Sequence, residues 1–263
     1  MIYKTIDFDI VDKVATIKLS RPEYYNSLNE QMAKELLNVA YECDQNSSIR
    51  CVILTGEGEK AFCSGGDLKS FYEQEENVSR HLKEVTHCLH GAITRFSRMD
   101  APLIVAVNGV AAGAGLSFVG FADLAVCSDK ASFVSAYSKA GLTPDGSSSY
   151  FLPRIIGSRR YLELVLTNKI LSSKEALEWG LINKIFEHEI LYKETFKIAK
   201  ELSEGPTLAF GRTKELVHNS FTSSLEGQME LETIMISKSA DTEDGKEGIR
   251  SFVKKEKPTF LGK

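Results

Sequence analysis

The chain of 263 residues lacks several features that define whole classes of protein. No stretch approaches the ~20 consecutive apolar residues of a membrane-spanning helix, and the chain does not open on an apolar signal segment. The net charge is −4, and no basic stripe with interleaved aromatic residues is present. We therefore expect a cytoplasmic protein that binds neither a membrane nor nucleic acid.

Paired metal ligands and paired cysteines are also lacking. The five cysteines (43, 51, 63, 88 and 127) are an odd number, and no two form a Cys-x-x-Cys pair. His81, His87 and His90 are spaced to share roughly one helical face, but no carboxylate completes a Glu-x-x-His pattern. We expect reduced core thiols, no disulfide and no metal site.

The usual phosphate-binding motifs are missing as well. There is no Gly-x-x-x-x-Gly-Lys-Ser/Thr loop, and Gly113-Ala114-Gly115 does not continue into the dinucleotide-binding pattern. Asp129 stands near the place of a ribose-binding acid, but one carboxylate in a charged turn is weak support for that reading. Neither a nucleotide phosphate loop nor a dinucleotide cofactor is expected.

What is present is an alternation of strand and helix patterns. Residues 7 to 19 alternate around Asp12-Lys13 like a hairpin, and a helix is expected to follow Asn29. Residues 78 to 98 have the spacing of a long amphipathic helix. Further strands are expected at 51 to 56, 103 to 107, 124 to 127 and 133 to 136. This alternation predicts an α/β core with parallel or spiral packing, in which both sheet faces are covered.

The pattern changes after Gly205-Pro206. Residues 208 to 217, 225 to 239 and 245 to 255 read as helices, and no strand pattern remains. We therefore divide the chain into a core at 1–205 and a helical region at 206–263. Such a region can pack on a partner subunit or on its own core, and both alternatives stay open.

Two turns rich in small residues follow strand patterns, at residues 61 to 68 and 108 to 115. Small side chains let a ligand approach the backbone closely. The first N–H groups of a helix lack intrahelical partners and can hold an anion or a polarised carbonyl. The alternative is a tight strand-to-helix connection that binds nothing.

Several motifs together resemble the crotonase superfamily, which has the enoyl-CoA hydratase and isomerase fold. They include Arg21-Pro22 followed by Asn26-Ser27-Leu28, the 61 to 68 turn, the 108 to 115 turn, Leu152-Pro153-Arg154, the segment 176 to 181 and the ending 257 to 263. The resemblance implies a spiral of repeated ββα units with a C-terminal helical region. It also implies a homotrimer or dimer of trimers and an acyl-CoA substrate, with no separate cofactor.

The resemblance assigns a purpose to both turns. It implies that the backbone N–H groups of Gly66 and Ala114 converge on the thioester oxygen and stabilise an enolate. It places the adenine of CoA against Cys63, Ser64, Asp67 and Leu68, with Lys69 near a phosphate. Phe260 and Lys263 match a tail that in relatives can reach a neighbouring protomer's CoA.

The sequence departs from the hydratases at their two catalytic glutamates. Ser117 and Tyr137 stand at those positions, and neither can act as a carboxylate base. Asp145, in Pro144-Asp145, instead resembles the single general base of Δ3,Δ2-enoyl-CoA isomerases and of the phenylacetate-pathway epoxide isomerase. We therefore predict a double-bond isomerase, with Asp145 as its base. The alternative for Asp145 is a turn aspartate that caps a helix beginning near Gly146.

Other functions than double-bond isomerisation remain open, both for an enzyme and for a protein without catalytic activity. His90, Tyr137 and Asp145 match the spacing of the His, Trp and Asp of 4-chlorobenzoyl-CoA dehalogenase, in which the histidine activates water. Hydratase-type chemistry is a further alternative. So is a non-catalytic acyl-CoA-binding homologue, although Asp145 and the small residues at 66 and 114 argue against it.

Overall fold

The first element is the hairpin that the alternating pattern predicts. In the computed structural model, which describes residues 3–263, β1 (Ile6–Val11) pairs with β2 (Val14–Leu19) in antiparallel register. Asp12 and Lys13 between them have positive φ angles of 51° and 69°. Two such residues form the kind of two-residue turn whose twist matches that of the flanking strands.

The hairpin leads into a sheet of six strands in the order β1-β2-β3-β5-β7-β10. All pairings after the hairpin are parallel. The added strands are β3 (Cys51–Gly56), β5 (Leu103–Val107), β7 (Leu124–Ser128) and β10 (Lys184–Phe186). The expected strands at 51 to 56, 103 to 107 and 124 to 127 are thus confirmed.

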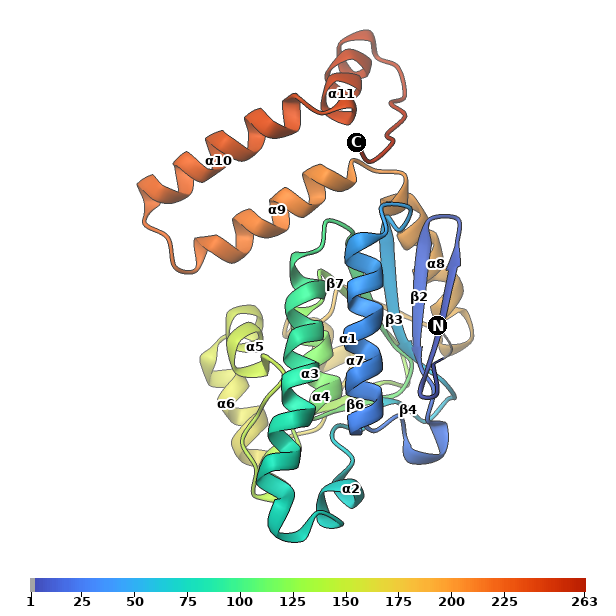
Figure 1. The fold of residues 1–263 in the computed structure, drawn as a ribbon, viewed down its shortest axis with the longest axis vertical. Coiled ribbons are helices and arrows are strands. Elements are labelled where there is room, and N and C mark those ends of the chain that lie inside the picture. Colours follow the sequence, from blue (N-terminus) through green and yellow to red (C-terminus); the bar gives the residue numbers. More distant parts are fainter. Residues whose placement is uncertain (1–2) are drawn as a thin grey trace.

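Helices cover both faces of this sheet, as the continuous apolar runs predict. Ile53 and Ile104 pack with residues of α8 (Leu191–Ser203) on one face. Leu54 and Val105 belong to the larger core on the other face, beneath α1 (Glu30–Gln45) and α3 (Val78–Arg98). Figure 1 shows α1 and α3 lying side by side along the sheet.

A second sheet contains β4 (Ala61–Cys63), β6 (Val110–Ala112), β8 (Ser132–Val134) and β9 (Leu171–Ser172). The chain alternates between the sheets, so that β3-β4-α3, β5-β6-α4 (Ala114–Phe121) and β7-β8-α5 (Ser148–Ile156) repeat one ββα unit. The predicted spiral is therefore present. The segment read as a continuous turn at 108 to 115 instead contains β6, and the strand expected at 133 to 136 ends at Val134.

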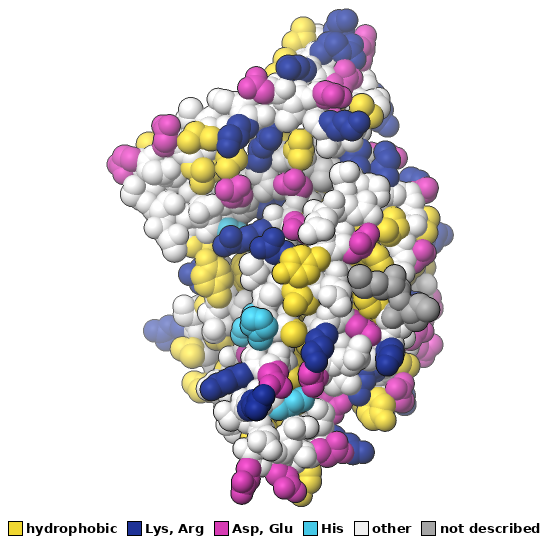
Figure 2. Space-filling model, in the orientation of Figure 1, with side chains coloured by type: hydrophobic (Ala, Val, Ile, Leu, Met, Phe, Trp, Pro, Cys, Tyr) yellow, Lys and Arg dark blue, Asp and Glu magenta, His cyan; other side chains and the backbone are white. Residues whose placement is uncertain are grey.

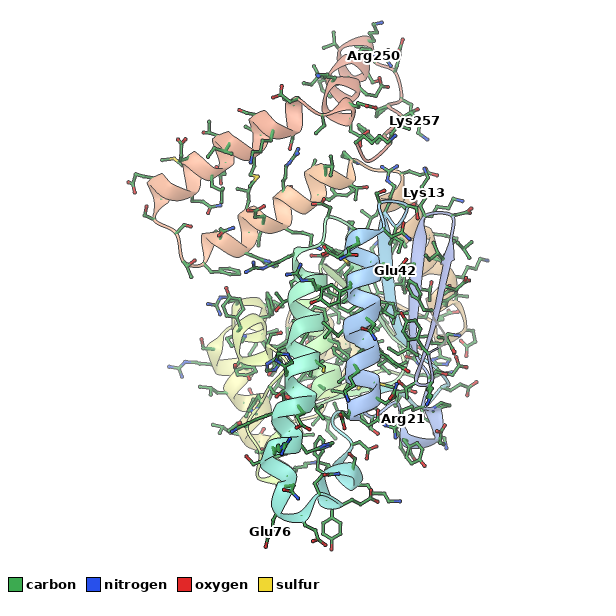
Figure 3. The ribbon with its side chains drawn as sticks, viewed as in Figure 1. Lys13, Arg21, Glu42, Glu76, Arg250 and Lys257 are labelled. Carbon is green, nitrogen blue, oxygen red and sulfur yellow. The ribbon has the colours of Figure 1, made fainter. Side chains whose placement is uncertain are left out.

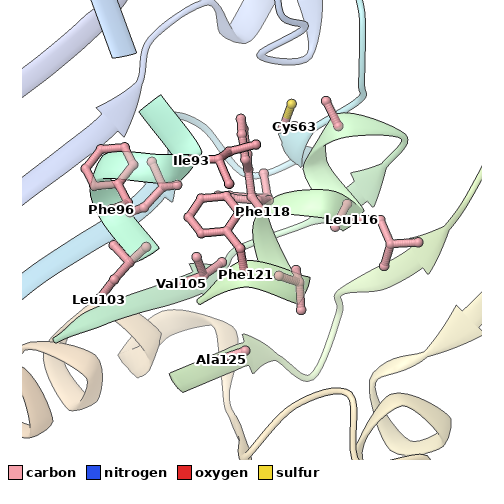
Figure 4. Packing of buried hydrophobic residues seen from close by; sticks show 14 of the residues in the cluster. Cys63, Ile93, Phe96, Leu103, Val105, Leu116, Phe118, Phe121 and Ala125 are labelled. Carbon is pink, nitrogen blue, oxygen red and sulfur yellow. The ribbon is translucent and has the colours of Figure 1, made fainter. Parts of the chain in front are cut away.

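The helix α4 lies at the centre of the molecule, and all eight of its residues are buried. Phe118 packs edge to face with Phe121, and Phe121 stacks on Phe96 of α3 at a centroid distance of 6.3 Å. Figure 4 shows these rings with Val105 and Leu103 beneath them. This packing fixes the first turn of α4, which carries Ala114.

Polar side chains fix the corner where the chain passes from one sheet to the other. The amide of Asn26 donates to the Ala61 carbonyl at 2.9 Å, and the Asn108 side chain accepts from the Gly56 N–H at 3.1 Å. Arg21, labelled in Figure 3 near the start of α1, pairs with Asp67 at 2.9 Å. The family motifs at 21 to 27 and 108 thus support the turn at 61 to 68.

The remaining elements of the core surround these sheets. They are the helices α2 (Leu68–Tyr72), α6 (Ser158–Thr167) and α7 (Ser173–Glu178), and short 3-10 helices at Pro22–Tyr24, Glu75–Asn77, Tyr137–Ala140 and His188–Ile190. Within residues 3–263, no helix is both long and apolar enough to cross a membrane.

The C-terminal helices α9 (Thr207–Ser220), α10 (Leu225–Ala240) and α11 (Glu243–Lys254) form an arm at one end of the molecule (Figure 1). The ammonium group of Lys214 in α9 lies 2.8 Å from the Asp123 carboxylate of the core. Burial raises the pKa of Asp123, and the charge of Lys214 opposes that rise. One helix of the arm therefore packs on its own core, while α10 and α11 extend beyond it.

Candidate active site

Three parallel strands of the small sheet end at the same edge. Residues 64 to 67 follow β4, Gly113 and Ala114 follow β6, and residues 135 to 137 follow β8. Gly113 and Gly65 are so close that a Cβ atom on Gly113 would lie 3.3 Å from the Gly65 Cα atom. The topology therefore brings together the two small-residue turns, which are about 50 residues apart in the sequence.

These strand ends surround a cavity of about 240 Å³. Its wall is largely apolar, and α3 contributes Leu82 and Val85 to it. The polar side chains include those of Tyr137 and Asp145. Other lining residues are Leu28, Ser64, Gly66, Leu68, Phe71, Ala114 and Leu142. Such a mixture of apolar wall and few polar groups is typical of a small-molecule site.

The N–H groups of Gly66 and Ala114 belong to backbone that lines this cavity. Within residues 3–263, neither of these amides donates a hydrogen bond to a protein acceptor. Leu28 holds the segment from outside: its N–H donates to the Gly65 carbonyl, and its carbonyl accepts from the Asp67 N–H. Two unpartnered donors in a rigid frame can bind an oxygen atom that carries developing negative charge.

Close approach explains the glycine that follows Ala114. A Cβ atom on Gly115 would lie 2.2 Å from the Cys63 carbonyl oxygen, so no larger residue fits between the two turns. Gly113 has a φ of +52°, a conformation that side chains disfavour. Both glycines are therefore required by the geometry of the site.

Asp145 reaches the cavity from the loop that precedes α5. The Tyr137 hydroxyl donates to its Oδ1 atom at 2.6 Å. The alternative in which Asp145 caps the next helix is wrong, because α5 begins at Ser148 and its N-terminus receives no side-chain hydrogen bond. Asp145 instead lines the cavity and is bound to Tyr137.

Tyr137 is a donor in this pair. Burial, the charge of Asp145 and the hydrogen bond to Asp145 raise the pKa of the Tyr137 phenol far above its usual range, and a weaker opposing effect comes from Ser117. The phenol therefore keeps its proton at neutral pH. Since Tyr137 occupies Oδ1, the Oδ2 atom is the oxygen left to accept a proton.

His90 lies on the exposed side of the Asp145 turn. Its Nε2 atom accepts a hydrogen bond from the Gly146 N–H at 3.2 Å. The side chain is exposed and is not part of the cavity wall. The structure thus places His90 beside the loop that carries Asp145. Its Nε2 atom, however, is occupied by the hydrogen bond from the Gly146 backbone.

The residues assigned to CoA lie in different surroundings. Ser64 and Leu68 line the cavity, and Lys69 is exposed on α2. The Cys63 side chain is fully buried, which raises the pKa of its thiol to about 12, so only its backbone can face a ligand. Asp67 is bound to Arg21 and caps α2 by accepting from the Ser70 N–H.

Phe260 and Lys263 lie with the arm rather than with the cavity of their own chain. The Phe260 carbonyl accepts from Arg50 at 2.9 Å, and the Lys263 carbonyl accepts from the Asp244 N–H at 3.0 Å. Figure 1 places the C-terminus at the opposite end of the molecule from α2. Within one protomer these two residues therefore do not meet the others assigned to CoA.

Sequence reasoning missed the contribution of α3 and of Ser117. Leu82 and Val85 belong to the apolar face of α3. The spacing of apolar residues on a helix does not distinguish residues that line a cavity from residues that pack in a core. At Ser117 the sequence indicates only that a hydratase glutamate is absent. In the structure the Ser117 hydroxyl lies 3.0 Å from the Asp145 carbonyl and 3.2 Å from the Tyr137 hydroxyl.

The spiral of ββα units and the apolar cavity at its strand ends define a crotonase-fold protein. The chain belongs to the enoyl-CoA hydratase/isomerase family, whose model matches residues 9–263. It is therefore an acyl-CoA enzyme of that family.

Individual relatives differ in their chemistry. The chain is 34% identical to a 1,2-epoxyphenylacetyl-CoA isomerase of Escherichia coli, over 95% of each chain. It is 35% identical to a 4-chlorobenzoyl coenzyme A dehalogenase of an Arthrobacter species, over 86% of this chain and 82% of the relative. A crystal structure of an enoyl-CoA hydratase from Bacillus anthracis superposes with a TM-score of 0.92, at 29% identity and over 99% and 100% of the chains.

Proposed function

We propose that the protein shifts a double bond of an acyl-CoA, converting a 3-enoyl-CoA into a 2-enoyl-CoA. The observation that carries this proposal is the single carboxylate, Asp145, in a cavity that also contains the free N–H groups of Gly66 and Ala114. One carboxylate that removes and returns a proton is sufficient for isomerisation. Hydration of the family type uses two acids, and Ser117 and Tyr137 stand in their places.

The reaction follows from these groups. The thioester oxygen accepts hydrogen bonds from the Gly66 and Ala114 amides, which makes the α-carbon more acidic. Oδ2 of Asp145 takes the α-proton, and the electron pair spreads over a dienolate that extends to the γ-carbon. Asp145 then returns the proton to the γ-carbon, which leaves a double bond between the α- and β-carbons. No atom is gained or lost.

For binding of CoA we keep the assignment that the family implies. Ser64, Leu68 and the backbone of Cys63 and Asp67 contact the nucleotide, and Lys69 pairs with a phosphate. The exposed position of Lys69 on α2, next to the cavity residue Leu68, supports this role. Phe260 and Lys263 would reach the CoA of a neighbouring protomer, in agreement with their distance from the cavity of their own chain.

Dehalogenase-type hydrolysis is the second candidate, because a relative of that name is as similar as the isomerase. In that reading Asp145 attacks an aromatic ring and His90 activates a water molecule. The hydrogen bond from Gly146 to His90 argues against it, since Nε2 is not available to accept a proton from water while that bond exists.

The test is turnover of a panel of CoA thioesters, comprising 3-enoyl, 2-enoyl, epoxyphenylacetyl and 4-chlorobenzoyl forms. We expect the highest kcat/KM with the 3-enoyl thioester and formation of the 2-enoyl product. Preferred hydration of the 2-enoyl thioester, or release of chloride from the chlorobenzoyl thioester, would refute the isomerase proposal. Binding of the whole panel without turnover would favour the non-catalytic homologue.

A further inference from the structure

Ser117 connects the two halves of the site. It lies one turn after Ala114 in α4, and it is fully buried. Its hydroxyl is 3.0 Å from the Asp145 carbonyl, 3.2 Å from the Tyr137 hydroxyl and 3.3 Å from the Gly113 carbonyl. One oxygen atom thus contacts the turn that carries the free Ala114 amide and the loop that carries the base.

The direction of the hydrogen bonds follows from the number of protons. The Tyr137 hydroxyl has one hydrogen, which it donates to Oδ1 of Asp145 at 2.6 Å. Its oxygen can then act toward Ser117 only as an acceptor. The Ser117 hydrogen therefore has three possible acceptors: the Asp145 carbonyl, the Tyr137 oxygen and the Gly113 carbonyl. The Asp145 carbonyl is the nearest of the three, at 3.0 Å, and a bond to it restrains the loop that carries the base.

The packing around Ser117 leaves this loop little room to move. Gly146, next to Asp145, has a φ of +58°, and a Cβ atom there would lie 3.0 Å from the Ser117 Cβ atom. On the other side of the loop, the Gly146 N–H donates a hydrogen bond to Nε2 of His90. The loop is therefore fixed at its backbone by Ser117 and His90, and at its carboxylate by Tyr137.

We propose that Ser117 is a positioning residue, which holds the Asp145 carboxylate at a fixed place relative to the Gly66 and Ala114 amides. It acts through a hydrogen bond to the Asp145 carbonyl and through close packing against Gly146. The inference rests on the proposed role of Asp145 as the base. In this chain, the position that holds a catalytic glutamate in hydratases holds instead the residue that orients a base from another loop.

The test compares Ser117→Ala with Ser203→Ala, each alone and combined with Asp145→Asn. Ser203 is also buried and donates to a backbone carbonyl, at 2.8 Å, but it lies in α8 on the opposite face of the large sheet. We expect Ser117→Ala to lower kcat about 10–100-fold with little change in KM, because small displacements of a catalytic group are costly. Ser203→Ala should leave kcat unchanged.

The double variants separate positioning from general structure. In the Asp145→Asn background, Ser117→Ala should lower the residual kcat by less than about 2-fold, because the base through which it acts is already lost. Wild-type kcat in Ser117→Ala would overturn the inference, as would an equal loss of kcat in both backgrounds or an equal loss in Ser203→Ala.

The substrate used for these variants is the thioester of the panel whose kcat falls most in Asp145→Asn. If that thioester is not the 3-enoyl form, the proposed function fails, while the effect of Ser117→Ala still decides the positioning role. A chain that turns over none of the thioesters would overturn both.

Discussion

At the scale of single residues, the candidate site depends on the hydrogen bond between Tyr137 and Asp145. Its length of 2.6 Å and its charged acceptor place it among the stronger hydrogen bonds of proteins. It leaves Oδ2 as the oxygen that does not accept from Tyr137 and that would carry the proton in the proposed reaction. The family resemblance supplied both residues by their spacing, but it gave no indication that they contact each other, because that contact depends on the loop between them.

Tyr137→Phe should lower kcat about 10–100-fold, which corresponds to the ~1.5–3 kcal/mol of a hydrogen bond to a charged group. Because the pKa of the Tyr137 phenol is raised above 10, the donor stays protonated throughout the usual assay range. The ratio of wild-type to variant kcat should therefore stay constant from about pH 7 to pH 10. A ratio that falls toward one as the pH approaches 10 would show that the phenol ionises in this range.

At the scale of elements, the site depends on where three short strands end. The hairpin, β5 and α3 could be predicted because their apolar spacing is a local property of the sequence. The strand β6 could not, since Val110-Ala111-Ala112 is short and is paired only with β4 and β8, which are distant in the sequence. The expected start of α5 near Gly146 is wrong because Gly146 and Ser147 have positive φ angles of 58° and 65°, so the helix begins only at Ser148.

The first residue of α4 offers a test of the amide pair. Ala114 lines the cavity, so in the proposed site the two methyl groups added by Ala114→Val should displace the thioester from the Gly66 and Ala114 amides. The kcat/KM should then fall by about 10²-fold or more, as it does when a thioester loses an oxyanion donor. The matched control is Ala209→Val in the first turn of α9, which carries the same helix-propensity cost of below ~0.7 kcal/mol. Normal kcat/KM in a folded Ala114→Val protein would remove this turn from the active site.

At the scale of the molecule, the arm leaves large apolar side chains in water. Phe252 in α11 is 87% exposed and Ile236 in α10 is 71% exposed. On the face drawn in Figure 2, acidic and basic side chains are interspersed, and hydrophobic side chains lie between them on the arm. Such an exposed set of apolar residues indicates a protein–protein interface. We propose that α10 and α11 pack on a second copy in a homotrimer or a dimer of trimers.

Phe252→Asp should weaken this assembly without unfolding the monomer, because the side chain makes few contacts within its own chain. Light scattering should give a multiple of 29.2 kDa for the wild type and a smaller mass for the variant. Arg80→Asp near the start of α3, at a side chain that is 83% exposed and not apolar, is the control and should keep the wild-type mass. A wild-type mass of one chain would refute the assembly.

In the proposed isomerisation, Asp145 alone carries the proton between two carbons of an acyl-CoA. The most direct measurement is turnover of a 3-enoyl-CoA in deuterated water by the wild type and by Asp145→Asn, which keeps the size of the side chain. We predict 2-enoyl product from the wild type, with partial deuterium at the γ-carbon where the acid exchanges before it returns the proton. The kcat of Asp145→Asn should be lower by about 10²–10⁴-fold. Equal kcat in both proteins, or rapid hydration of the 2-enoyl-CoA by both, would contradict this role of Asp145.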